Sequence, residues 1–254
     1  MKNFALLIAI TFSASFTFLS CEKEITSPNN DITVIKSTGD IQNDVEAFRS
    51  LLGPLNTTPG ATTGRREINW DGVPDSLQDV ALPLDFFNPT GDNAVASLQR
   101  GVTYSAKGAF MVSSASFAEI NSGASSQFHS FSGSNTFANV SAARWDVSFQ
   151  KAGTTSSAAV QAFGLVFSDV DEENSTSLEF FDGDKSLGKY FVPPHDATSS
   201  FSFLGVYFKN GEHITKVTVS HDGFLSEGTK DISDNGTRDL VVLDDFIYSE
   251  PVVQ

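Results

Sequence analysis

Short runs of apolar residues at every second position are the feature that most constrains how this chain can fold. Trp145, Val147 and Phe149 fall on one face of such a run, and residues 163–167 repeat the pattern. Side chains at alternate positions of a β-strand point to the same face, so these runs predict half-buried strands. Residues 201–208 are apolar at both sets of alternating positions, which predicts a central strand that is buried on both faces.

Turn sequences separate these runs and predict how they are joined. Asn210-Gly211 directly follows residues 201–208 and precedes a further run at 215–219, which predicts a tight hairpin. The turn at 182–185 (DGDK) predicts a second hairpin in the same way.

The fold class follows from many short strands and few helical patterns. Residues 42–52 (QNDVEAFRSLL) carry apolar residues at helical spacing before a Gly-Pro stop, which predicts one short helix. Residues 240–248 form a closing strand, whereas residues 90–140 are rich in Ser, Ala, Gly and Asn and predict long loops around the strand-like segments GVTYS and GAFMVSS. We therefore predict an all-β sandwich of jelly-roll type with one short N-terminal helix.

Length and composition predict one exported domain and exclude one class of partner. Residues 1–20 have the charged start and apolar run of a signal peptide, residues 21–41 form a polar tether, and residues 42–250 suit a single β-domain. The chain has 23 Phe but only 4 Tyr and 2 Trp, which favours aromatic rings buried in a core. A net charge of -15 excludes nucleic acid as a partner, because neutralising phosphates requires clustered Lys and Arg.

Cys21 is the only cysteine, so the chain can form neither an intramolecular disulfide nor a Cys-based zinc site. The segment Phe18-Leu19-Ser20-Cys21 resembles a bacterial lipobox, with Phe and Leu where other residues are usual, and the EKE that follows resembles the surface-export signal of Bacteroidota-type lipoproteins. The resemblance implies a lipid anchor on Cys21 and a location at the outer membrane or cell surface. The alternative is cleavage by ordinary signal peptidase, with Cys21 incidental.

Two longer resemblances concern the domain itself. The segment GRREINWDGV at 64–73, together with FSDVD at 167–171 and the closing DDFIYSEP, resembles a family of secreted bacterial β-sandwich proteins, a resemblance that implies no activity. The second half also resembles the galactose-binding-domain jelly rolls of carbohydrate-binding modules. Likeness of fold does not establish function.

No catalytic motif stands out in the sequence, and we expect no enzyme activity and no catalytic residues. The four histidines lack zinc-hydrolase spacing, and most of them are expected at the surface or in loops. No Gly-x-Ser-x-Gly elbow or glycosidase strand motif occurs. An acidic group follows the strand at 163–167, and we interpret it as a solvated turn in preference to a calcium loop. Its members are Asp169, Asp171, Glu172 and Glu173, with Asp182 and Asp184 at the next turn.

Two kinds of binding site remain as hypotheses. Galactose-binding-type modules often hold a structural calcium ion where their first and last strands meet, so Asp71, Asp244 and Asp245 are candidate calcium ligands. Adjacent strand residues point to opposite faces, so only one of Asp244 and Asp245 should reach the ion unless a bulge intervenes. The alternative is that one of these carboxylates is solvated and the other caps a loop.

The sequence does not identify the ligand-binding residues of the domain. Trp70, Tyr104 and Trp145 are the aromatic residues considered for stacking on sugars, although Trp145 is expected in the core and Trp70 at the sandwich edge. The leading hypothesis is a non-enzymatic surface lipoprotein that binds an extracellular glycan or another ligand. The alternative is a structural or adhesive protein that presents loops to other proteins, and an unrecognised polysaccharide hydrolase or lyase ranks third.

Overall fold

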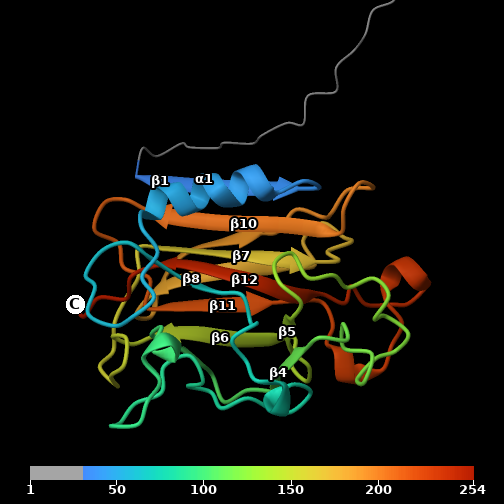
Figure 1. Cartoon of the computed structure of the whole chain (residues 1–254). Helices are drawn as coiled ribbons and strands as arrows, with labels where there is room; N and C mark the ends of the chain where they lie inside the picture. The colour runs from blue at the N-terminus through green and yellow to red at the C-terminus, as the bar shows by residue number, and fades with distance from the viewer. Residues whose placement is uncertain (1–30) are drawn as a thin grey trace, which may run out of the picture.

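The computed structural model describes residues 31–254, which form two antiparallel sheets packed face to face (Figure 1). The predicted signal peptide and Cys21 lie outside the described residues. The seven-stranded sheet has the order β1-β10-β7-β12-β5-β4, with β2 also paired to β12. Its strands are β1 (Ile32–Thr38), β2 (Arg65–Ile68), β4 (Phe110–Ser113), β5 (Thr136–Asn139), β7 (Ala162–Ser168), β10 (Phe201–Phe208) and β12 (Val242–Ser249).

The five-stranded sheet has the order β3-β6-β11-β8-β9. Apart from the β4–β5 and β8–β9 hairpins, every connection from β2 onward crosses from one sheet to the other. The predicted all-β sandwich with one short helix near the N-terminus is confirmed. The strands of this second sheet are β3 (Val102–Tyr104), β6 (Arg144–Phe149), β8 (Ser177–Asp182), β9 (Lys185–Phe191) and β11 (Lys216–Ser220).

The main core lies between the sheets and contains most of the aromatic rings. Trp70 is fully buried there, with its ring centroid 3.7 Å from that of Phe137, and its indole N–H donates to the Asp244 carbonyl. Trp145 and Tyr104 are buried beside them. All three aromatic residues considered for sugar stacking are therefore core residues, and the expectation that Trp70 lies at the edge is wrong.

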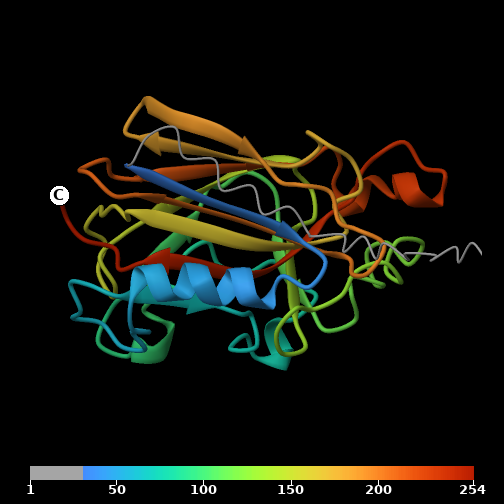
Figure 2. The same ribbon diagram turned by 90° about the horizontal axis from the view of Figure 1, so that it is seen from above.

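A smaller core lies on the outer face of the seven-stranded sheet, under helix α1 (Gln42–Leu52) (Figures 1 and 2). The helix has the bounds that its apolar spacing predicts. Phe48 lies over Gly164 and Gly205, which are paired across β7 and β10. A Cβ atom at either glycine would come within 2.8 Å of the Phe48 ring, so these two glycines make the room for the helix. No helix in the described part of the chain is long and apolar enough to cross a membrane.

Two sequence expectations about connectivity are wrong. Residues 32–38 form the edge strand β1, paired to β10 along its length, rather than part of the tether, so the domain begins before residue 42. The Asn210-Gly211 turn does not close a hairpin, because β10 and β11 belong to different sheets. The predicted hairpin at 182–185 is confirmed as the β8–β9 turn.

The remaining connections contain four short 3-10 helices. Their bounds are η1 (Asp75–Leu77), η2 (Ala96–Leu98), η3 (Leu225–Glu227) and η4 (Ile232–Asp234). The last two lie in the long β11–β12 connection, at the end of the sandwich where β7 finishes (right side of Figure 1).

Candidate metal centre

Five side chains gather where β7 ends, and we call them the acidic cluster. Asp169 and Asp171 directly follow β7, His195 lies in the β9–β10 connection, and Asp231 and Asp239 lie in the β11–β12 connection. Ligand atoms of Asp169, Asp171 and His195 all lie within 4.8 Å of one another, and the same holds for Asp171, Asp231 and Asp239. The cluster therefore joins three connections that are distant in sequence.

The backbone around Asp169 directs the first part of the cluster inward. Asp169 has a left-handed φ of 71°, which turns the chain out of β7, and its N–H donates to the Ser200 carbonyl. Val170 then packs into the main core, and its carbonyl accepts from the His195 N–H at 2.7 Å. These contacts place His195 beside the two carboxylates. A left-handed aspartate is a strained conformation that the surrounding contacts must maintain.

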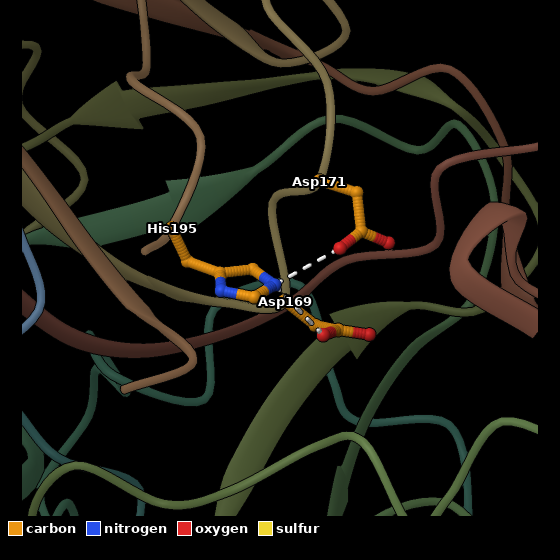
Figure 3. A group of neighbouring side chains, drawn as sticks. All are labelled: Asp169, Asp171 and His195. Carbon is orange, nitrogen blue, oxygen red and sulfur yellow. Dashed lines mark hydrogen bonds and ion pairs between the residues drawn. The ribbon is translucent and has the colours of Figure 1, made fainter. Parts of the chain in front are cut away.

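One ring nitrogen of His195 faces both carboxylates (Figure 3). Its Nε2 is 2.9 Å from Asp171 Oδ1 and 3.7 Å from Asp169 Oδ1, and its Nδ1 is 2.8 Å from the Asp196 carbonyl oxygen. Because a carbonyl only accepts, Nδ1 carries a proton. In the neutral ring, Nε2 then presents a lone pair toward a carboxylate oxygen, so a proton or a cation is needed between them. Metal-ligating histidines are commonly oriented by such a backbone hydrogen bond.

Asp231 and Asp239 form the buried floor of the cluster, and both are fully buried. Asp239 Oδ2 accepts from the backbone N–H groups of Asp171 and Glu172, each at 3.1 Å. Asp231 accepts from the N–H and hydroxyl of Ser233 through Oδ1, and from the Leu240 N–H through Oδ2. These bonds hold the β11–β12 connection against the segment after β7.

Several buried oxygens of the cluster have no hydrogen-bond partner. They are Asp169 Oδ2, Asp171 Oδ2 and Asp239 Oδ1. Leaving a buried charged oxygen unpaired costs several kcal/mol, so native proteins commonly place a ligand or a proton there. The unpaired oxygens are therefore positions at which a proton or a cation would bind.

The cluster has an excess of acidic groups, and this excess and burial shift the pKa values of its side chains. Burial and the neighbouring Asp171 carboxyl raise the pKa of Asp169 to about 8. Burial and the neighbouring Asp231 carboxyl raise the pKa of Asp171 to about 7. Burial lowers the pKa of His195, but the Asp196 carbonyl and the Asp171 carboxylate outweigh it and leave that pKa raised. Among the described residues, His195 is the only cationic group that pairs with these carboxylates.

The donor set favours a divalent cation that accepts both oxygen and nitrogen. Carboxylates suit Mg²⁺, Ca²⁺ and Mn²⁺, whereas imidazole suits Zn²⁺ and the later transition metals. Ca²⁺ takes oxygen ligands almost alone, so a histidine in the set favours Mn²⁺ or Zn²⁺.

The three candidate calcium ligands instead surround the loop at 131–135. Asp71 is exposed and accepts from the backbone of Ser134 and Asn135. Among the described residues these three carboxylates do not form one of the groups whose ligand atoms converge. The calcium ion between them stays a prediction.

A bulge in β12 determines how Asp244 and Asp245 lie. The register of β12 against β7 shifts between Leu243 and Phe246, and both carboxylates reach Ser132: Asp244 accepts from its N–H and Asp245 from its hydroxyl. Asp245 also forms an ion pair with Arg49 of α1. The bulge therefore overrides the expectation that only one of the two carboxylates reaches a common site.

Sequence reasoning identified part of the acidic cluster but misjudged its setting. The predicted solvated turn holds for Glu172 and Glu173, which are exposed, and is wrong for Asp169, which is 4% exposed. Asp231 and Asp239 were missed. The available signal was the Asp-x-Asp pattern directly after an apolar strand, together with a second aspartate-rich segment at 231–239.

Comparison with known protein families, with curated proteins and with solved structures finds no match to this chain.

Proposed function

We propose that this protein is a non-enzymatic surface protein that holds a divalent metal ion in the acidic cluster and presents the loops fastened by that ion to an extracellular partner. The observation that carries the proposal is the set of unpartnered buried oxygens around His195, with no Lys or Arg from the described residues to compensate them. A metal bound there would fasten three connections at one end of the sandwich.

The burial of the cluster supports a role in binding rather than in catalysis. The side chains of His195, Asp171 and Asp169 are 25%, 13% and 6% exposed, and the aspartates beneath them are fully buried. Catalytic metal sites keep a position open for water and substrate, whereas structural sites are closed by protein ligands. An enclosed ion suits the shaping of a surface.

The buried aromatics favour a protein partner over a glycan. Sugar-binding sites that act by stacking need exposed rings, and Trp70, Tyr104 and Trp145 are all in the core. The hypothesis of a loop-presenting structural or adhesive protein therefore replaces glycan binding as the leading one.

The metal can be tested with purified residues 31–254 stripped by chelator. Mn²⁺ or Zn²⁺ should raise the melting temperature in a concentration-dependent way, since an ion at 100 times its Kd stabilises the folded state by about 2.7 kcal/mol. Asp169→Asn should reduce the shift, and Glu173→Gln, an exposed neighbour, should retain it in full. Identical melting curves in chelator and in millimolar metal would overturn the proposal.

The location of the protein is proposed from the sequence alone. If Cys21 carries a lipid, the full chain should incorporate labelled fatty acid and partition into detergent, and Cys21→Ala should do neither. A mature wild-type protein without lipid would contradict the anchor and leave the metal proposal untouched.

A further inference from the structure

The acidic cluster has two halves that meet at one residue. Asp171 belongs both to the group with Asp169 and His195 and to the group with Asp231 and Asp239. The five residues do not form a single group, so some ligand atoms of one half lie more than 4.8 Å from those of the other.

This division matters because all ligands of one ion must lie within a limited distance of one another. Ligands on opposite sides of one ion are separated by twice the bond length, about 4 to 5 Å for metal–ligand bonds of about 2.0 to 2.5 Å. One ion therefore cannot be bound by all five residues in the arrangement observed. Two ion positions with Asp171 between them accommodate every ligand.

Each half has its own unsatisfied, buried oxygen. Asp169 Oδ2 lacks a partner in the first half and Asp239 Oδ1 lacks one in the second, and the Asp171 carboxylate carries a further unpartnered oxygen, Oδ2. Asp239 is fully buried, and its other oxygen is already engaged by the backbone of Asp171 and Glu172. These bonds fix the carboxylate in place and leave Asp239 Oδ1 without a hydrogen-bond partner.

The charge of the cluster also favours two ions. Metal binding requires the four carboxyls to be deprotonated, which gives them a formal charge of −4, and among the described residues only His195 pairs with any of them. With one dication, two carboxyls would have to keep their protons, whereas two dications balance all four carboxylates with a neutral histidine. Uncompensated buried charge is strongly disfavoured.

We propose that the acidic cluster is a dinuclear centre for divalent transition-metal ions, in which Asp171 bridges one ion held by Asp169 and His195 and a second held by Asp231 and Asp239. This inference rests on the proposed function and deepens it, because it fixes the number of ions and the residue they share. The second ion would bind the β11–β12 connection to the segment after β7.

The test is the Mn²⁺ stoichiometry of residues 31–254, measured by equilibrium dialysis and metal analysis. The wild type should bind two Mn²⁺, and Asp169→Asn and Asp239→Asn should each bind one. Asp239→Asn is the sharper variant, since its amide oxygen can keep the hydrogen bonds from Asp171 and Glu172 while the ligand oxygen is lost. Glu173→Gln should keep both ions.

An independent readout is electron paramagnetic resonance of the Mn²⁺-loaded wild type. Two ions that share a carboxylate should give an exchange-coupled signal, and Asp239→Asn should restore the six-line signal of an isolated ion. One Mn²⁺ per wild-type chain, or two uncoupled ions, would overturn the dinuclear centre and leave the proposed function standing. No bound Mn²⁺ or Zn²⁺ would overturn both.

Discussion

Arg66 and Glu250 form a fully buried ion pair in which two N–H groups of the guanidinium donate to the two carboxylate oxygens at 2.6 and 2.7 Å. Removing one partner of such a pair strands a buried charge. We expect Glu250→Gln to lower the free energy of unfolding by about 3 to 5 kcal/mol. Urea unfolding followed by fluorescence measures this.

An exposed ion pair serves as the control that separates the effect of burial from the effect of charge. The exposed pair Lys185–Glu212 should contribute about 0 to 1 kcal/mol, so Glu212→Gln should change little. The double variant Arg66→Met with Glu250→Leu should recover most of the lost stability. A Glu250→Gln variant as stable as Glu212→Gln would contradict this account of the pair.

Asp244 should make the stability of the folded state depend on pH. Burial and the adjacent Asp245 carboxylate raise the pKa of Asp244 to about 9, so the folded state keeps this carboxyl protonated while the unfolded chain releases the proton near pH 4. Its contribution to stability is therefore fully present below about pH 4 and is lost as the pH rises toward 9. Asp244→Asn should flatten the decline of the melting temperature between pH 5 and pH 9.

Asp71→Asn is the control for this experiment, because Asp71 holds the same loop from its exposed side. It should leave the slope unchanged. Parallel pH profiles for the wild type and Asp244→Asn would show that Asp244 is not the titrating group.

At the scale of elements, Gly211 links β10 to β11 with a φ of 76° and open space around its Cα. A β-branched residue is strained in that conformation whatever space it has, so Gly211→Val should destabilise the fold by about 1 to 3 kcal/mol. Thermal unfolding of this variant beside Gly72→Val, which lacks a positive φ and also has free space, isolates the backbone effect. Equal melting temperatures for the two variants would contradict it.

The two turns that were predicted as hairpins show where local sequence stops being informative. Gly183 and Gly211 both adopt positive φ, as their turns require. Gly183 joins neighbouring strands, whereas the chain at Gly211 crosses to the other sheet because β10 already has β1 and β7 as partners. A turn motif specifies a local conformation, and pairing depends on strands that are distant in sequence.

Strand β1 belongs to the domain, so a stable fragment should begin before residue 32. Val34 packs in the main core, and Ile35 and Ile41 pack under α1, so residues 42–254 lack three buried hydrophobic side chains and expose the edge of β10. We expect this fragment to be less stable than residues 31–254 by about 5 to 9 kcal/mol. Removal of the exposed residues 253–254 is the matched control. Equal urea midpoints for 31–254 and 42–254 would contradict the role of β1.

At the scale of the whole molecule, the sandwich was predictable and most of the candidate metal centre was not. Alternating apolar residues report which face of a strand is buried, and this information is local. His195 and Asp239 lie 24 and 68 residues from Asp171, and only the crossing of connections between the sheets brings them together. The Asp-x-Asp pattern was visible, but its burial depends on those distant loops.

We propose a metal ion at one end of the sandwich, and one measurement tests for it directly. The direct measurement is X-ray diffraction from crystals of residues 31–254 grown with Mn²⁺, with an anomalous difference map. We predict a peak within ligand distance of His195 Nε2 and of carboxylate oxygens of Asp169 and Asp171. A map without a peak at the cluster, with His195 still hydrogen-bonded to Asp171, would contradict the central claim.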